Sequence, residues 1–164
     1  MSLLPILKWP DARLAQPCAP VGEITPEIRT LVADMLETMY AAPGRGLAAP
    51  QVGVLRRLFV MDPNGSKGPR DPRVFLDPVI EARSDETALG PEGCLSIPGL
   101  VADVERSIEI VVAWRDLDGK AHRETLTGFA AICAQHEIDH LDGIVTLDRV
   151  AAPDRDLLEE AYTA

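Results

Sequence analysis

The chain has 164 residues, of which 46% are hydrophobic, so it is long and apolar enough to form one domain with a buried core. Its 26 acidic residues outnumber its 16 lysines and arginines, which gives a formal net charge of −10. This charge would repel nucleic acid and anionic membranes, so neither is expected as a partner. No stretch reaches the roughly 18 apolar residues of a membrane helix, and the three cysteines lack the spacing of a disulfide framework. We expect one catalytic domain over residues 1–164, monomeric and in a reducing cytoplasm.

The first element in chain order is a helix that begins near Thr25. Thr25 followed by Pro26 is typical of an N-cap and a first turn, and apolar residues then recur at helical spacing as far as Met39. The helix should end before Pro43. The following stretch, GRGLAAPQVG at residues 44–53, has too many helix breakers to continue it and is predicted as a shaped loop.

Four short apolar segments, separated by Pro, Gly and Asp, are predicted as strands. They lie at residues 58–61, 74–80, 108–114 and 122–126. Asp118-Gly119 between the last two indicates a hairpin, and the Pro- and Gly-rich residues 62–73 indicate an exposed loop.

A second helix is predicted after Thr127, which can cap it, and Gly143 should end it. One stripe of this helix carries Phe129, Ile132, Cys133, His136 and His140, so that face should be buried. The expected fold class is therefore α+β, with mixed or antiparallel short strands around a central buried helix.

The end of the chain is predicted to form a short acidic helix over residues 154–162. Its apolar residues Leu157, Leu158 and Ala161 should pack on the body of the domain.

Two of the three histidines stand in the segment from His136 to His140, which reads HEIDH and matches the motif HExxH. On a helix, side chains four positions apart share a face with about 5–6 Å between their Cβ atoms, so both imidazoles can bind one metal ion. Glu137 projects about 100° around the helix from His136, which suits a general base better than a ligand.

A third protein ligand, which catalytic metal sites usually have, decides the class of enzyme. The extended protease motif HExxHxxGxxH fails at Thr146, which is a poor ligand. Another class of metallopeptidase would use a downstream carboxylate, here Glu159 or Glu160. Cys94 is the other candidate, because a thiolate and two imidazoles form a soft site for Fe²⁺ or Zn²⁺. A non-catalytic metal-binding module is the alternative from another class of function.

Three segments, in this order and spacing, resemble the three motifs of bacterial peptide deformylases: GRGLAAPQ at 44–51, EGCLSIP at 92–98 and QHEIDHLDG at 135–143. The resemblance extends over nearly the whole chain. It implies a metal-dependent hydrolase that removes the formyl group from the N-terminal methionine of newly made polypeptides. It also implies Fe²⁺ as the native ion, with Zn²⁺, Ni²⁺ or Co²⁺ as substitutes.

The resemblance assigns roles to particular residues. The metal ligands would be Cys94, His136 and His140. Glu137 would accept a proton from the attacking water and pass it to the leaving amine. The Gln51 amide and the Leu95 backbone N–H would donate hydrogen bonds to the formyl oxygen as negative charge develops on it.

The resemblance also implies a substrate cleft. Backbone groups that pair with the peptide in strand fashion would come from Gly44, Arg45, Gly46 and Gly93. A pocket for the methionine side chain would be lined by Phe129, Ile132 and Cys133, for which ordinary core packing is nearly as good an explanation. Glu92 would be paired with Arg106, which avoids an unpaired buried carboxylate.

Some positions depart from the family pattern. Arg45 stands where a small aliphatic residue is usual, and Val101 where an Arg that contacts the peptide is frequent, so the preferred residue after methionine stays open. The C-terminal segment is acidic, with Asp154, Asp156, Glu159 and Glu160. Ribosome docking through a basic C-terminal helix is therefore not expected. Association through another surface stays open, as does a role as a specialised second copy of the enzyme.

Overall fold

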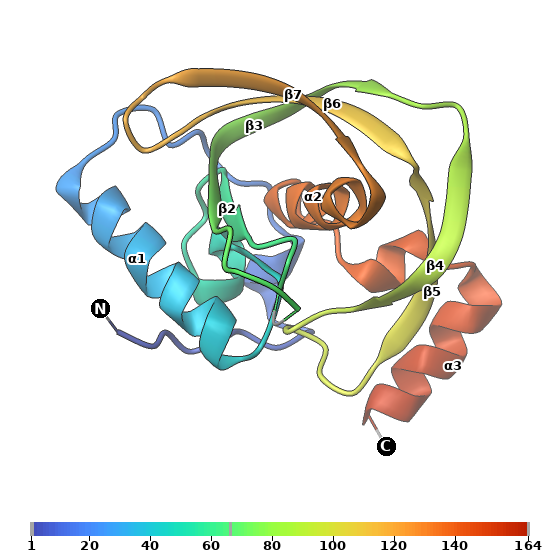
Figure 1. The fold of residues 1–164 in the computed structure, drawn as a ribbon. Coiled ribbons are helices and arrows are strands. Elements are labelled where there is room, and N and C mark those ends of the chain that lie inside the picture. Colours follow the sequence, from blue (N-terminus) through green and yellow to red (C-terminus); the bar gives the residue numbers. More distant parts are fainter. Residues whose placement is uncertain (1, 66, 164) are drawn as a thin grey trace.

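Two antiparallel sheets curve around helix α2 (Gly128–Leu141), which lies at the centre of the molecule (Figure 1). The computed structural model describes residues 2–65 and 67–163. The larger sheet has the strand order β1-β2-β3-β6-β7, and the smaller one pairs β4 with β5. The strand pairs of both sheets are antiparallel. The predicted α+β class, with strands around a central buried helix, is confirmed.

The elements have the following bounds. The strands are β1 (Gly46–Ala48), β2 (Leu58–Met61), β3 (Arg73–Arg83), β4 (Thr87–Gly93), β5 (Val101–Ser107), β6 (Glu109–Arg115) and β7 (Ala121–Thr127). The other helices are α1 (Pro26–Ala41) and α3 (Ala152–Thr163), with short 3-10 helices η1 (Ala12–Ala15), η2 (Ala49–Val52) and η3 (Thr146–Arg149). No helix within the described residues is long and apolar enough to cross a membrane.

The predicted strands correspond to β2, β3, β6 and β7, with ends that differ by at most a few residues. The prediction that residues 44–53 form a loop was wrong in part, because the short strand β1 and the turn η2 lie within them. β1 is specified by its pairing with β2, in which Leu47 lies opposite Val60. The local pattern of glycines and prolines cannot reveal a partner strand that lies further along the sequence.

The sequence pattern also missed β4 and β5, which pair over their whole length. β4 contains Gly90, Pro91 and Gly93, which usually interrupt a strand. β5 alternates between exposed and buried residues, but Ala102 and Arg106 are among its buried ones, so the expected run of large apolar residues is absent. The two strands instead form because each satisfies the backbone hydrogen bonds of the other.

Helix α1 covers one side of the larger sheet, near β1 and β2 (Figure 1). It is capped as predicted, since the Thr25 hydroxyl accepts a hydrogen bond from the Ile28 N–H at 3.3 Å. Its buried face carries Met35 and Met39, which belong to one apolar cluster with Leu58 of β2.

Helix α2 packs against the concave side of the larger sheet. Ile138 and Leu141 lie in one buried cluster with Phe59, Phe75 and Trp114. The rings of Phe59 and Phe75 stack with centroids 4.5 Å apart. Burial of these large side chains is the main contribution to the stability of the sheet-helix contact, at about 25 cal/mol per Å² of apolar surface.

The C-terminal helix α3 forms as predicted but uses different contacts. Leu158 and Tyr162 pack near Trp9, and the Tyr162 hydroxyl donates to the Trp9 carbonyl at 2.9 Å. The prediction was wrong for Leu157, which is 67% exposed, and for Ala161, which is also exposed. The N-terminal segment that receives α3 is distant in sequence, so the helical pattern alone could not select the contact face.

We expect Gly143→Ala to destabilise the fold more than Gly119→Ala. Both glycines have positive φ angles, +77° and +80°, so an alanine is strained at either position. At Gly143 an added Cβ would also lie 2.9 Å from the backbone of Ala15 and Gln16, whereas at Gly119 the nearest atom is 3.9 Å away. Thermal unfolding should show a loss of about 1 kcal/mol for Gly119→Ala and roughly 2–4 kcal/mol for Gly143→Ala. Equal losses would contradict the close approach at Gly143.

Candidate active site

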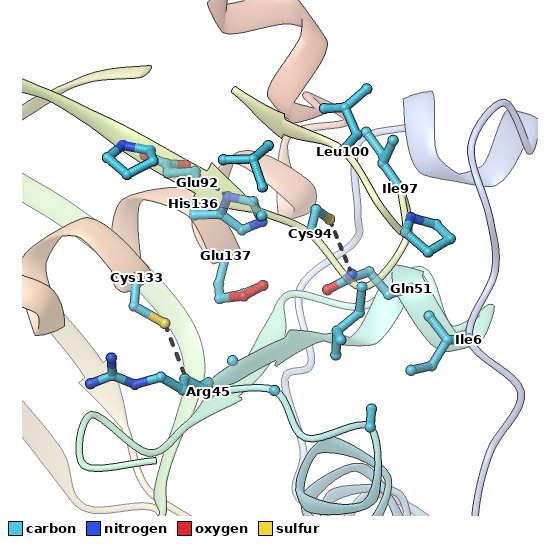
Figure 2. A pocket seen from close by; sticks show the side chains of 18 of the residues that line it. Ile6, Arg45, Gln51, Glu92, Cys94, Ile97, Leu100, Cys133, His136 and Glu137 are labelled. Carbon is cyan, nitrogen blue, oxygen red and sulfur yellow. Dashed lines mark hydrogen bonds and ion pairs between the residues drawn. The ribbon is translucent and has the colours of Figure 1, made fainter. Parts of the chain in front are cut away.

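A cavity of about 680 Å³ lies between β1, the end of β4 and helix α2. Nearly all residues that the sequence predicted for the site line this cavity: Gly44, Arg45, Gly46, Gln51, Gly93, Cys94, Leu95, Phe129, Ile132, Cys133, His136 and Glu137. His140 is the exception, because it is 1% exposed and lies behind Cys94. The polar side chains of Gln51, Cys94, His136 and Glu137 gather around one space (Figure 2).

Cys94, His136 and His140 come together although two different parts of the chain supply them. Each offers a ligand atom, and the three atoms lie within 4.8 Å of one another. The Cys94 Sγ lies 3.4 Å from the His140 Nε2, and the imidazole centroids are 5.0 Å apart. The helix supplies both histidines from one face, as their spacing predicted, and the turn after β4 supplies the thiol.

Hydrogen bonding and burial suit these three residues to a metal ion. The Nδ1 of His136 lies 3.0 Å from the Glu92 Oε1, so its Nε2 is left for ligation. Burial opposes ionisation of Glu92, but the hydrogen bonds from Arg106 and His136 outweigh it and lower the pKa of Glu92 to about 2. Burial also lowers the pKa of His140, which keeps this imidazole neutral as a ligand must be. Burial opposes protonation of His136, but its hydrogen bonds with Cys94 and Glu92 outweigh burial and raise its pKa, so this imidazole must lose a proton to bind a metal. A thiolate with two neutral imidazoles is the resulting donor set, and it fits Fe²⁺ or Zn²⁺.

Glu137 is held beside the predicted ligands without an ion pair. It is 2% exposed, and burial raises its pKa to about 7. A carboxyl group with a pKa near neutrality can both take up and release a proton. Gly46 of β1 leaves the room that this carboxylate occupies, since an added Cβ there would come within 2.7 Å of Glu137 Oε2.

Gln51 is fixed in one orientation next to the Cys94 thiol. Its Oε1 accepts a hydrogen bond from the Ala48 N–H at 3.0 Å, which turns its NH₂ group the other way. The NH₂ group donates to the Ser96 hydroxyl at 3.0 Å and lies 3.7 Å from the Cys94 Sγ (Figure 2). The backbone N–H of Leu95 is used by no hydrogen bond among the described residues.

The end of the cavity near Phe129 is apolar except for the guanidinium of Arg45. Ile132 and Cys133 form part of its wall, and Phe129 is 39% exposed at its edge. The guanidinium of Arg45 lies 3.4 Å from the centre of the Phe129 ring. Val101 is 63% exposed at the rim, so both positions that depart from the family pattern border the cavity.

Three residues that support the site had not been singled out from the sequence. Ser96 is completely buried and orients Gln51. Asp139 accepts hydrogen bonds from Arg106 at 2.7 Å and from Arg149 at 2.7 and 3.0 Å. Ser96 lies inside the motif at 92–98 and Asp139 inside the motif at 135–143, so both could have been suspected from the sequence. Nothing in the sequence around Arg149 indicated a role in the site.

Comparison with known proteins agrees with this geometry. The polypeptide deformylase family profile matches residues 3–156. Peptide deformylase from Afipia carboxidovorans is 45% identical over 163 residues, covering 99% of this chain and 95% of the relative. The crystal structure of the Ehrlichia chaffeensis peptide deformylase with actinonin matches at a TM-score of 0.91 and 39% identity, covering 99% of this chain and 98% of that one. The Thermotoga maritima peptide deformylase matches at 0.85 and 38%, covering 91% and 98%.

The fold and the cavity, with a Cys/His/His group beside a buried carboxyl, define a metal-dependent hydrolase. With the matches over nearly its full length, the chain belongs to the peptide deformylase family. It removes the N-formyl group from newly made polypeptides in a metal-dependent reaction, as inferred from the motifs.

The alternative functions are not supported. A metallopeptidase would need Glu159 or Glu160 near the histidines, but the group among the described residues that could hold a metal ion contains Cys94 instead. Glu159 lies on α3 and forms an ion pair with Arg155. A non-catalytic metal-binding module is not supported either, because the matched family consists of enzymes.

We expect Arg106→Met to destabilise the protein strongly, because it leaves Glu92 and Asp139 buried without their cation. Arg106 is 6% exposed and bonds to both. Removing one partner of a buried ion pair typically lowers the free energy of unfolding by about 3–5 kcal/mol. The control Arg123→Met removes an ion pair on β7 in which the Arg123 side chain is 68% exposed, and it should cost less than about 1 kcal/mol. Chemical denaturation measures both. Similar losses would show that the buried network does not stabilise the fold.

Proposed function

We propose that Cys94, His136 and His140 hold the catalytic metal and that Glu137 moves the proton during deformylation. The observation that carries this proposal is the approach of the three ligand atoms to within 4.8 Å of one another, beside a buried carboxyl group. When bound, the metal supplies Lewis-acid chemistry, which lowers the pKa of water and polarises a carbonyl group.

Glu137 acts as the base and then as the acid. As water attacks the formyl carbon, the carboxylate accepts a proton from it, and it later donates this proton to the nitrogen of the leaving amine. Burial suits Glu137 to this exchange, because its pKa of about 7 makes neither step strongly uphill near neutral pH.

Gln51 and Leu95 stabilise the negative charge that develops on the formyl oxygen. The Gln51 NH₂ group is already oriented by Ala48 and Ser96, so little reorganisation is needed when the charge appears. The free N–H of Leu95 is the second donor. Removing one donor of this kind typically slows catalysis by about 10²- to 10³-fold.

The peptide binds between the two sheets as an added strand. β1 is an edge strand of the larger sheet, and β4 pairs on one side only, so each offers unpaired backbone groups toward the cavity. Gly44, Arg45 and Gly46 provide one line of partners and Gly93 the other. The methionine side chain then enters the apolar end, against Phe129, Ile132 and Cys133.

Fe²⁺ is the proposed native ion, with Zn²⁺, Ni²⁺ or Co²⁺ able to replace it. The soft thiolate and the two imidazoles suit these metals and disfavour Mg²⁺ and Ca²⁺, which prefer oxygen ligands. The enzyme is proposed to act in the cytoplasm as a monomer and as one catalytic domain over residues 1–164. Three free cysteines agree with a reducing environment. Any contact with the ribosome would not use α3 as a basic helix, since that helix is acidic.

Cys94→Ala should abolish stable metal binding, because it removes one of three protein ligands. The measurement is metal content per chain after anaerobic purification and dialysis. Cys18→Ala is the matched control, since Cys18 is also a free cysteine but packs in the core outside the cavity. Stoichiometric metal in the Cys94 variant would refute its role as a ligand, whereas loss in both variants would point to general misfolding.

Glu137→Gln should retain the metal and lose most activity, because the amide keeps the size of the side chain but cannot exchange the proton. Formate release from formyl-Met-Ala-Ser by the iron-loaded protein should fall by about 10²- to 10⁴-fold in kcat. Metal content checked in the same samples separates loss of the base from loss of the ion. A variant as fast as the wild type would disprove the role of Glu137.

A further inference from the structure

A second, smaller pocket of about 220 Å³ adjoins the catalytic cavity. It lies between the end of α1, at Tyr40, and the connection from β2 to β3. Gly44 and Arg45 line both the catalytic cavity and this pocket, so the two share a wall. Arg45 lies at the end of the catalytic cavity, beside Cys133 (Figure 2).

Three cations line this basic pocket: Arg45, Lys67 and Arg70. The Arg45 guanidinium lies over Phe129 and donates to the carbonyl of Pro63, while the Arg70 guanidinium lies 4.0 Å from the centre of the Tyr40 ring.

None of these cations forms an ion pair with another described residue, and no described lining residue is acidic. Of the carboxylates beside the pocket, Asp71 is paired with Arg73 and Asp62 is buried behind Tyr40, so the three cations still leave a local excess of positive charge in a chain of net charge −10. Such a site attracts anions and repels cations.

The pocket is held in shape by a buried carboxylate. Asp62 is completely buried and accepts hydrogen bonds from the Tyr40 hydroxyl at 2.7 Å, from the Asn64 N–H at 2.9 Å and from the Asp71 N–H at 3.0 Å. The Asp62 N–H in turn donates to the Arg45 carbonyl at 2.9 Å. These bonds tie the β2–β3 connection to both α1 and the wall of the catalytic cavity. Asn64 and Asp71, which stand on either side of Lys67 and Arg70 in the sequence, are therefore fixed to Asp62, and Arg45 faces them from the segment before β1.

We propose that this basic pocket binds an acidic side chain of the substrate, an Asp or Glu within the three residues after the formylmethionine. The inference rests on the proposed course of the peptide along Gly44 to Gly46. An extended chain advances about 3.3 Å per residue, so the first residues beyond methionine pass the shared wall at Gly44 and Arg45. A carboxylate there can approach guanidinium and ammonium donors, which form the stronger, charge-assisted hydrogen bonds.

The test is a set of formyl-Met peptides with Asp, Asn or Lys at the second, third or fourth position. At one position at least, the Asp peptide should have a kcat/KM about three- to tenfold higher than the Asn peptide at low ionic strength. The difference should lie mainly in KM, because the contact is remote from the reacting bond. It should shrink at 0.5 M NaCl, since salt screens exposed charges.

Lys67→Gln/Arg70→Gln should bring the Asp-to-Asn ratio close to one. Arg29→Gln/Lys120→Gln removes the same charge near the β6–β7 hairpin, where Arg29 donates to the Leu117 carbonyl, and it should keep the wild-type ratio. If the first double variant fails to fold, Lys67→Gln alone serves, because Lys67 is exposed. This single variant should lower the Asp-to-Asn ratio, but by less than the double variant.

Calorimetry on the deformylated peptides, with Asp or Asn at the second, third or fourth position, separates this proposal from the proposed function because it needs no catalysis. Tighter binding of the Asp peptides supports the pocket even if formate release fails. Equal kcat/KM and equal binding for all charges would overturn the proposal. A different result would assign the pocket to a free anion and overturn it as a substrate site. In that case inorganic phosphate would raise the thermal stability of the protein more than NaCl of equal ionic strength does, and the charge of the peptide would have no effect.

Discussion

The geometry of the proposed metal site depends on the buried guanidinium of Arg106. Arg106 lies on β5 and bonds to Glu92 on β4 and to Asp139 on α2. Cys94 follows two residues after Glu92, and His140 follows directly after Asp139, so one side chain holds together the two segments that supply the proposed metal ligands. A two-stranded sheet is only marginally stable alone, and here its position against α2 is set by this ion pair network. The same Glu92 carboxylate orients the imidazole of His136, another proposed ligand.

Helix α2 serves the fold and the site through two adjacent faces. Gln135 and Asp139, four positions apart, face the β4–β5 sheet, where Gln135 exchanges hydrogen bonds with the backbone of Ser107 at 2.9 and 3.2 Å. His136 and His140, also four apart, face Cys94. The 3.6-residue period places these two pairs side by side on the helix. Any change that rotated the helix to improve packing at Asp139 would therefore also displace both histidines.

The sequence correctly predicted those parts of the structure that depend on a few neighbouring residues. The cap at Thr25, the hairpin at Asp118-Gly119 and the histidine spacing each depend on a few neighbouring residues, and each is found. β4 and β5 could not be predicted in this way, because proline and glycine usually interrupt strands, and Pro91 is tolerated here on an edge strand of a two-stranded sheet. The bond from Arg149 to Asp139 depends on how η3 folds back, which no periodicity encodes. The motifs nevertheless identified residues that line the cavity, since each motif is a short run of neighbouring residues whose pattern can be read locally.

The two walls of the catalytic cavity differ in how strongly buried interactions hold them in place. The wall that bears the proposed ligands is fixed by buried charges whose disruption costs several kcal/mol, so substitutions there affect folding and chemistry together. The opposite wall is a three-residue edge strand, β1, continued by Gly44 and Arg45 and supported by the β2–β3 connection through Asp62. Arg45 of this wall contacts the ring of Phe129 at the start of α2, and neither side chain belongs to the proposed ligands or to the buried ion-pair network. Substitutions on this wall can therefore alter which peptides bind while the proposed catalytic groups keep their geometry.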